Sequence, residues 1–378
     1  MVLDFLYNSN LLSLWFYLGS FILIISFIVF IHEFGHYYVA KLCKVKIECF
    51  SIGFGKELFG FNDKSGTRWK FCLIPMGGYV KMLGDADPAS SPDVKKINSL
   101  TEEQKQYAFY AKKLWQKTAI VFAGPLANYI LAIVILASFY VVYGKSVYQP
   151  VISNIVADMP AANSGMQIGD KITKIDNKDI NEFNDIVEII SLNTGDPVNV
   201  TFTRDNKNMD LTLTPKIIER KSIFGTKERV ALIGIYPPQQ PSDMVELNIF
   251  HSTWLATQDS VRYSAQILRA ISQIILGKRT IEDLGGPVKI AKYSGEAAKF
   301  GLKMVFWFIA MISISLGLFN LLPIPALDGG HLFFYLIEAL KGSPVTEKIQ
   351  QICVKTSIIF ILILAVFITY NDITMLLE

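Results

Sequence analysis

Cysteine and histidine are scarce in this chain, which has four of each among 378 residues. No cysteine lies between Cys72 and Cys353, so a disulfide framework is excluded for that whole interval. We expect the cysteines to be free thiols in a reducing compartment. They are Cys43, Cys49, Cys72 and Cys353.

Lysine and arginine are absent from the first 40 residues. This absence, and the length of the apolar run from Leu11 to Ala40, argue against a signal peptide and favour a retained membrane span. Three more apolar runs can cross a bilayer, at about 118–143, 302–322 and 352–370. Because apolar residues make up 51% of the chain, the sequence predicts a membrane α-helical protein with four transmembrane helices.

Positive charge is unevenly distributed, although the net charge is only +3. Residues 41–117 contain 14 Lys and Arg against 8 Asp and Glu, whereas residues 144–300 contain 18 of each kind. The positive-inside rule therefore predicts a cytoplasmic first loop, with both termini and the region 144–300 extracytoplasmic. We expect the lipid bilayer as a partner, and no nucleic acid.

The most informative stretch lies inside the first apolar run and reads His32-Glu33-Phe34-Gly35-His36. Residues four apart share a helix face, so the two histidines can bind one metal ion. Glu33 stands where it can take a proton from a metal-activated water. A carboxylate at the middle of a spanning helix costs ~2–3 kcal/mol, so such groups usually mark function. The alternative is a buried polar cluster that packs two helices.

A second motif ends the third apolar run and extends from Asn320 to His331. Its prolines, Pro323 and Pro325, break the backbone, and broken backbone at membrane depth survives only where protein or water satisfies it. Asp328 follows the break and can be presented into a cavity. Because both motifs fall late in their spans, they can meet at one depth. Two histidines, one carboxylate and a water make a catalytic zinc site.

Two turn signals and an alternating pattern predict a β-hairpin over residues 67–83, with its turn at Pro75-Met76-Gly77-Gly78. Its edge can hold an extended substrate by main-chain pairing, or the hairpin can simply seal the membrane boundary. Residues 85–117 predict a basic amphipathic helix on the inner membrane surface. In the second span, Asn128 is interpreted as a residue that packs helices.

The region 151–216 predicts a short helix, a strand, a helix at 184–192 and a strand pair at 198–204 and 209–214. This succession resembles a bacterial PDZ domain, a fold that binds peptides by adding a strand to its sheet. His251 lies beyond it and is interpreted as a surface or core histidine.

The paired motifs and their order along the chain resemble the site-2 protease family, which are M50 intramembrane zinc metalloproteases. The string Gly-Pro-Leu-Ala-Asn ending at Asn128, and the PDZ-like insert, are similar to its bacterial RseP/RasP branch. The resemblance implies one zinc ion held by His32, His36 and Asp328, with Glu33 as the general base. It also implies that Asn320 hydrogen-bonds the substrate backbone.

The same resemblance implies that the hairpin is membrane-associated and that its edge, at Tyr79, Val80 and Lys81, binds substrate. His331 is interpreted as a structural residue or one that supports the ligands. The implied substrates are single-pass membrane proteins, either trimmed anti-sigma factors or leftover signal peptides. Peptide C-termini or extended segments are expected at the PDZ-like domain, and the implied location is the bacterial inner membrane, with the active site toward the cytoplasm.

The predicted organisation has four parts. Residues 1–143 hold spans one and two with the hairpin, 144–222 the PDZ-like domain, 223–300 amphipathic linker helices, and 301–378 spans three and four. Two other functions stay open: an ion or proton transporter that uses the intramembrane histidines and aspartate, and an inactive binding module that uses only its PDZ-like groove. Four spans with no internal repeat are few for a transport path.

Overall fold

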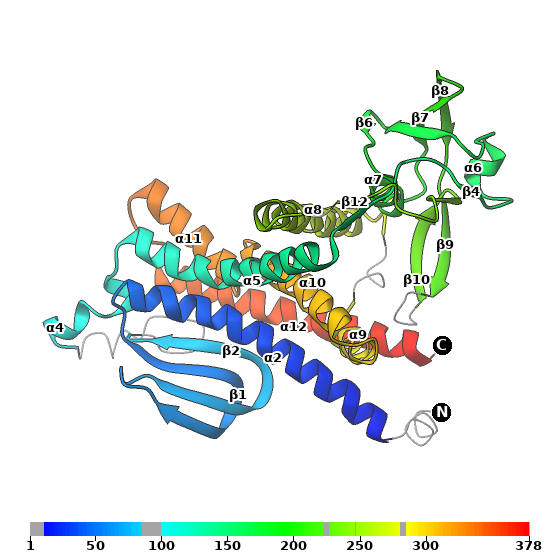
Figure 1. Ribbon diagram of the computed structural model, residues 1–378. Helices are drawn as coiled ribbons and strands as arrows, with labels where there is room; N and C mark the ends of the chain where they lie inside the picture. The colour runs from blue at the N-terminus through cyan, green and yellow to red at the C-terminus, as the bar shows by residue number, and fades with distance from the viewer. Residues whose placement is uncertain (1–10, 85–99, 222–226, 246, 280–284, 378) are drawn as a thin grey trace. The chain divides into compact units, whose positions relative to one another are not determined.

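The computed structural model describes residues 11–84, 100–221, 227–245, 247–279 and 285–377 (Figure 1). The chain forms two compact units. The first contains residues 1–135 and 285–378, and the second contains residues 136–284. Helix α5 (Leu114–Tyr143) begins in the first unit and ends in the second.

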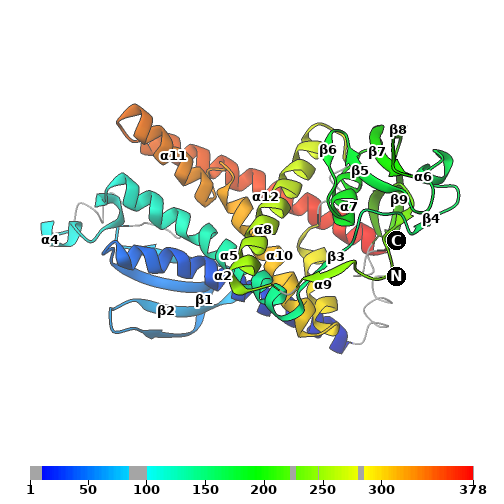
Figure 2. The same ribbon diagram turned by 45° about the horizontal axis from the view of Figure 1, so that its top comes forward.

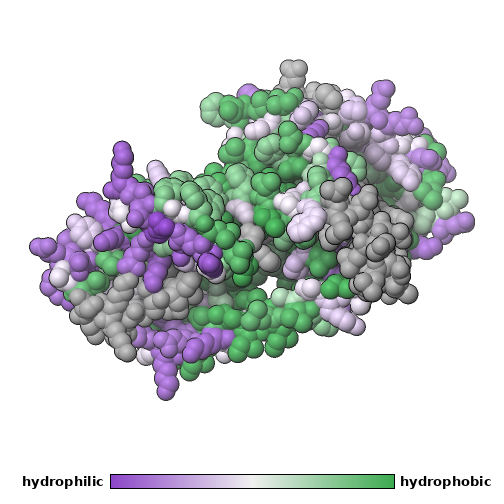
Figure 3. Space-filling view, turned by 90° about the horizontal axis from the view of Figure 1, so that it is seen from below, coloured by the Kyte–Doolittle hydropathy of each residue, from purple (hydrophilic) through white to green (hydrophobic). Residues whose placement is uncertain are grey.

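Among the residues that the structure describes, four helices are long and apolar enough to cross a membrane, in agreement with the four predicted spans. They are α2 (Leu11–Leu42), α5, α10 (Leu302–Leu321) and α12 (Glu347–Leu377). Large apolar side chains remain exposed on them, as on α12 at Ile359, Phe360 and Val366. Much of the face shown in Figure 3 is hydrophobic for the same reason. A helix that leaves such side chains uncovered is suited to contact lipid.

The β-structure of the first unit is a hairpin, but it differs from the predicted one. Strand β1 (Ile47–Asn62) pairs with strand β2 (Arg68–Met82), so the connection is at residues 63–67 and not at Pro75–Gly78. Positive φ angles at Gly53, Gly55 and Gly77 bend the strands without ending them. The prediction was wrong because a local glycine signal does not distinguish a turn from a bend inside a long strand.

Asp63 fixes the connection between β1 and β2. Its carboxylate accepts hydrogen bonds from the backbone N–H groups of Ser65 at 2.8 Å and Thr67 at 2.9 Å. It also accepts from the Trp69 indole and the Tyr37 hydroxyl, which belongs to α2. Burial raises the pKa of Asp63, but these hydrogen bonds outweigh it and hold the pKa well below its usual range. The hairpin turn is thereby joined to the metal-motif helix.

Each long strand bends so that the sheet curls beside α2, as Figures 1 and 2 both show. Residues 57–62 pair with 68–72, and residues 47–52 pair with 78–82. Because residues 49–52 also pair with 68–71, they lie between 68–71 and 78–82. Among the described strands, 78–82 is thus at one edge of the sheet.

The prediction of an amphipathic helix over residues 85–117 is wrong for residues 100–113, which the structure describes. Residues 85–99 lie outside the described residues. The rest forms α4 (Glu102–Lys105) and a 3-10 turn at Phe109–Ala111 before α5 begins. Burial of Phe109 in a core with Phe50 and Ile120 takes the chain off a straight helical path.

Helix α9 (Pro287–Lys299) joins the ends of two spans. Asp372 of α12 is fully buried and accepts hydrogen bonds from the backbone N–H groups of Lys289 at 3.0 Å and Gly286 at 3.3 Å. Near the other end of α9, Glu296 accepts a hydrogen bond from the Tyr17 hydroxyl of α2. A carboxylate at a helix N-terminus satisfies donors that the helix cannot.

The second unit contains an α+β domain around a four-stranded antiparallel sheet of order β6-β5-β7-β8. The elements of this sheet and its two helices are β5 (Lys171–Ile175), β6 (Lys178–Asp179), β7 (Val198–Arg204), β8 (Lys207–Leu213), α6 (Pro160–Asn163) and α7 (Phe183–Ser191). The helices and strands predicted for residues 151–216 are therefore present. Their apolar faces close on one core that includes Ile172, Val200 and Ile186.

This unit continues beyond the predicted domain boundary at residue 222. Strand β11 (Ile235–Tyr236) pairs with β4 (Asn154–Ile155), and β12 (Asp243–Val245) pairs with β3 (Lys145–Val147). Ile233, which precedes β11, is buried in the same core. The unit also contains the hairpin of β9 (Lys216–Lys221) and β10 (Lys227–Leu232) and the long helix α8 (Ile249–Ile275).

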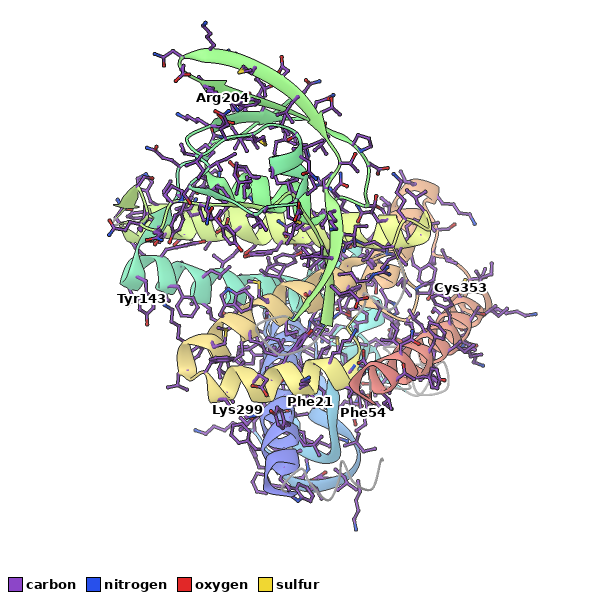
Figure 4. The ribbon with its side chains drawn as sticks, turned by 90° about the vertical axis from the view of Figure 1, so that its right-hand side faces the viewer. Phe21, Phe54, Tyr143, Arg204, Lys299 and Cys353 are labelled. Carbon is purple, nitrogen blue, oxygen red and sulfur yellow. The ribbon has the colours of Figure 1, made fainter. Side chains whose placement is uncertain are left out.

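The domain contains an ion pair whose carboxylate is buried and whose guanidinium is partly exposed. Asp170 is 1% exposed, and both its oxygens accept from the Arg204 guanidinium at 2.7 Å. Arg204 is labelled in Figure 4. Burial raises the pKa of Asp170, but the bond from Arg204 outweighs it and keeps the pKa below its usual range. Because Asp170 directly precedes β5 and Arg204 is the last residue of β7, the pair links the loop before β5 to the end of β7.

Candidate metal centre

Helix α2 places His32 and His36 on one face, four residues apart. Both side chains are buried, and their Nε2 atoms lie 3.3 Å apart. The rings are nearly perpendicular, with centroids 4.9 Å apart. Two Nε2 atoms placed in this way can bind the same metal ion through their lone pairs.

Asp328 completes the group from the other end of the chain. It is the first residue of α11 (Asp328–Lys341), directly after the proline-containing break that follows α10. Its Oδ2 atom lies 3.1 Å from Nε2 of His32 and 3.4 Å from Nε2 of His36. The motifs predicted to meet at one depth do lie together.

Two glycines set the path of the chain at Asp328. A Cβ at Gly329 would lie 2.2 Å from the Leu322 carbonyl oxygen, and one at Gly330 would lie 2.4 Å from the Ile324 carbonyl oxygen. The first turn of α11 therefore packs directly on the broken backbone that precedes it. A side chain at either position would push the carboxylate away from the histidines.

The three residues fit a zinc ion. Ligand atoms 2.0–2.1 Å from a tetrahedral zinc are about 3.3–3.4 Å from one another, and the three distances here are 3.1, 3.3 and 3.4 Å. Although buried, Asp328 Oδ2 accepts no hydrogen bond from the described residues. A buried carboxylate oxygen directed at two imidazole nitrogens is the donor set of a catalytic zinc site.

Helix α5 packs against the imidazole rings of both histidines. A Cβ at Gly124 would lie 2.2 Å from His36 Nε2 and 2.9 Å from His32 Cε1, so only glycine leaves room for both rings. The Ile120 carbonyl oxygen lies 2.9 Å from His36 Nδ1. The amide of Asn128 lies 3.2 Å from His32 Nδ1, a contact that the interpretation of Asn128 as a packing residue missed. The spacing of four between residues 120, 124 and 128 was the available signal.

A cavity of about 240 Å³ opens beside the three ligands. Glu33 lines it and is itself buried, one residue after the first ligand. Asn320, Tyr79 and Val80, three of the residues expected to bind substrate, also line it. Lys81 is not among the described residues that line the cavity. Successive side chains of a strand lie on opposite faces, so the Lys81 side chain is on the other face of β2 from that of Val80.

The remaining polar residues singled out in the sequence are Asn320 and His331, which line the cavity, and His251, which does not. Asn320 donates from Nδ2 to the Leu316 carbonyl at 3.0 Å, inside its own helix. His331 lines the cavity one helical turn after Asp328. His251 is exposed on α8 and lies 3.1 Å from the Asn248 side chain, so it belongs to that helix N-terminus.

Helix-borne histidines, a convergent aspartate and an adjacent buried glutamate are the residue types that a metallopeptidase site requires. The model of the family described as peptidase family M50 matches residues 20–364, and the chain belongs to this family. It is a zinc metalloprotease.

Relatives match along nearly the whole chain. A protein of Rickettsia conorii whose name includes zinc metalloprotease is 42% identical, covering 94% of this chain and 97% of that protein. A similarly named protein of Mesorhizobium japonicum is 36% identical, covering 94% of this chain and 98% of that protein. Metalloprotease MmpA of Caulobacter vibrioides is 33% identical, covering 94% of each.

A solved structure also matches part of the chain. It is the PDZ domain of an SdrC-like protein from Listeria monocytogenes, 26% identical, covering 24% of this chain and 86% of that one, with a TM-score of 0.18. A TM-score this low carries no argument about the fold of the second unit.

Proposed function

We propose that this protein is an intramembrane protease that hydrolyses a peptide bond within transmembrane segments of other membrane proteins. The observation that carries the proposal is the position of the ligands. His32 and His36 lie inside a helix that can span the bilayer, and Asp328 follows another such helix by a few residues. A peptide bond that reaches these residues must enter the bilayer or its edge.

The roles proposed for the residues follow from their positions. His32, His36 and Asp328 would hold one zinc ion, and an ion bound there would supply the Lewis acid that lowers the pKa of a water molecule toward neutrality. Glu33 takes a proton from the attacking water and gives it to the leaving amine. Burial of Glu33 beside the ligands, against the bend at Gly78, supports this role.

Substrate is proposed to bind extended along the edge formed by residues 78–82. A helical segment hides its carbonyl groups in its own hydrogen bonds, so it must unwind before it is cut. The edge at Tyr79 and Val80 lies beside the cavity, where an extended segment can approach its main chain, and Asn320 lines the same cavity from α10. Lys81 is proposed to contribute only through its backbone.

The hairpin is proposed to lie against the membrane. Large apolar side chains on its two strands are exposed, with Leu58 at 64% and Phe59 at 63%. Phe54, Phe61, Phe71, Leu73 and Ile74 are exposed as well. An aromatic surface of this kind is suited to the membrane interface.

Location and partners are proposed on charge and on the second unit. We place the protein in a bacterial inner membrane, with both termini extracytoplasmic and the active site toward the cytoplasm, because the excess of Lys and Arg follows the first span. Its substrates are single-pass proteins, such as trimmed anti-sigma factors or leftover signal peptides. A PDZ-like domain within the second unit is proposed to bind their C-termini or extended segments.

A co-expression assay tests the proposal. A tagged single-span reporter with its outer domain truncated is expressed with wild type, with Glu33→Gln, or with Glu103→Gln, which changes an exposed carboxylate on α4. We expect a shorter reporter with wild type and Glu103→Gln, and none with Glu33→Gln. Cleavage that persists in Glu33→Gln would contradict the role of Glu33. A set of several single-span reporters left uncut by zinc-loaded wild type would contradict intramembrane proteolysis.

A further inference from the structure

Asn128 is a polar residue at the middle of an apolar spanning helix, and it is fully buried. Its Nδ2 atom lies 3.2 Å from Nδ1 of His32. Its Oδ1 atom is buried with no hydrogen-bond partner among the residues that the structure describes. A buried amide oxygen without a donor costs about 1–3 kcal/mol, so its surroundings require an explanation.

Two orientations of the amide are possible, because its oxygen and nitrogen exchange places on a half-turn of the side chain. If Nδ2 donates to His32 Nδ1, the imidazole proton must lie on Nε2, the atom directed at Asp328 and His36. That tautomer cannot bind a metal through Nε2. If Oδ1 faces His32 instead, it accepts from Nδ1–H, and Nε2 keeps a free lone pair. The same half-turn gives Oδ1 a donor and leaves the Nε2 lone pair of His32 available to a metal, while Nδ2 takes the position that Oδ1 leaves.

The other histidine has the same arrangement. His36 Nδ1 lies 2.9 Å from the Ile120 carbonyl oxygen, which can only accept, so His36 carries its proton on Nδ1. Ile120 and Asn128 are on the same face of α5, one turn on either side of Gly124, whose missing side chain lets both rings approach. Helix α5 thus presents one acceptor to each imidazole.

We propose that Asn128 is a positioning residue that accepts the Nδ1–H of His32 and holds its Nε2 in the metal-binding tautomer. The proposal rests on the zinc centre proposed above. Metal-binding histidines generally donate their second ring N–H to an acceptor, and loss of that acceptor typically weakens metal binding by about 10–100-fold.

Two substitutions of similar size separate this role from helix packing. Asn128→Leu fills the same space but accepts no hydrogen bond, whereas Asn128→Asp keeps an acceptor oxygen beside His32. Asn128→Ala removes the amide without adding bulk, and replaces the leucine variant if that variant does not fold. Ser313→Ala, which removes a buried hydroxyl from the spanning helix α10, is the control for loss of a buried polar group away from the histidines.

The measurement is zinc affinity of the full chain in detergent, stripped with a chelator and titrated against a competing indicator. Cobalt absorption in the visible range reports the ligand geometry, and thermal unfolding of the metal-free protein reports helix packing. We expect zinc binding about 10–100-fold weaker in Asn128→Leu, with an altered cobalt spectrum, and near wild type in Asn128→Asp and Ser313→Ala. The metal-free proteins should unfold at similar temperatures.

Three outcomes would overturn the proposal. Asn128→Leu and Asn128→Ala that bind zinc as wild type does would show that His32 needs no acceptor. Equal losses in the leucine and aspartate variants, together with lower thermal stability of the metal-free proteins, would show a packing role alone. Wild type that takes up neither metal would overturn the zinc centre itself, and is recognised before any variant is compared.

Discussion

Gly124 of α5 lies directly against His36 of α2, so that a Cβ at position 124 would fall 2.2 Å from the imidazole Nε2. The contact is reciprocal, because a Cβ at Gly35 of α2 would fall 2.3 Å from the Ala123 carbonyl oxygen. Two glycines therefore allow the two helices to cross at the depth of the metal ligands. Neither glycine supplies a ligand, yet both decide where the ligands lie.

Gly124→Ala should abolish proteolysis and weaken zinc binding by at least about tenfold, because the new methyl group occupies the place of the His36 ring. The zinc content of the purified protein and reporter cleavage check this. The control is Gly19→Ala in α2, where a Cβ meets no atom within 4 Å. Full activity in Gly124→Ala would show that the helices separate easily at this crossing.

Asp328→Ala should greatly reduce the stabilisation of the folded protein by added zinc. Wild type saturated at about 1,000 times the dissociation constant should gain about 4 kcal/mol, seen as a rise in the unfolding temperature that a chelator reverses. Asp328→Ala should gain little at the same zinc concentration, because two histidines alone bind weakly. Asp205→Asn, which alters an exposed carboxylate between β7 and β8, should behave as wild type. An equal gain in Asp328→Ala would place the zinc elsewhere.

The Asp170–Arg204 pair should make the second unit sensitive to acid. Since the pKa of Asp170 is lowered in the folded state, the stabilisation is complete above its unfolded pKa of about 3.9 and is lost as the pH falls through the folded value. Arg204→Met should lose about 2–3 kcal/mol at pH 7, less than the 3–5 kcal/mol of a fully buried pair, because the guanidinium is partly exposed. The difference from wild type should shrink below pH 4.

Hydrogen exchange of β7 and β8 in the full chain, corrected for the intrinsic rate at each pH, measures this effect. Asp179→Asn is the control, because its partner Lys174 and Asp179 itself are both more than half exposed. Such a surface pair contributes ~0–1 kcal/mol. A pH-independent difference between wild type and Arg204→Met would show that packing of the arginine, not charge, stabilises the sheet.

Asp372→Ala should loosen α9 without changing the metal ligands. The substitution removes the acceptor of two backbone N–H groups at the N-terminus of α9, and should cost about 1–3 kcal/mol. Faster hydrogen exchange in residues 287–299 is the expected result, with Tyr370→Phe, which removes only the hydroxyl of a ring that is 65% exposed, as the control. Exchange unchanged from wild type would show that apolar contacts, such as that of Ile368 of α12 with Gly286, suffice to hold α9.

The ligands and their meeting could be predicted from the sequence because they obey short-range rules. A spacing of four puts His32 and His36 on one helix face, and the prolines before Asp328 mark a break that only a cavity or protein contact tolerates. The depth of each motif in its span follows from counting residues at 1.5 Å each. These rules need no knowledge of which helices are neighbours.

The remaining features depend on contacts between distant segments. The sequence contains turn signals at both 62–66 and 75–78, and the choice between them is made by pairing with residues 47–52. The importance of Gly124 and Asn128 appears only when α5 lies against α2. Likewise, strands β11 and β12 extend the second unit past residue 222 because their partners lie some 80 to 100 residues earlier.

The ligands are also far apart in the order in which the chain is synthesised. His32 and His36 enter the membrane first, and residues 37–327 must be made before Asp328 follows. At 5–20 residues per second this interval lasts roughly 15–60 s. During that time the nascent protein has two of its three ligands and no α10–α11 junction to close the cavity. A site built in this way is complete only when synthesis of the chain is nearly finished.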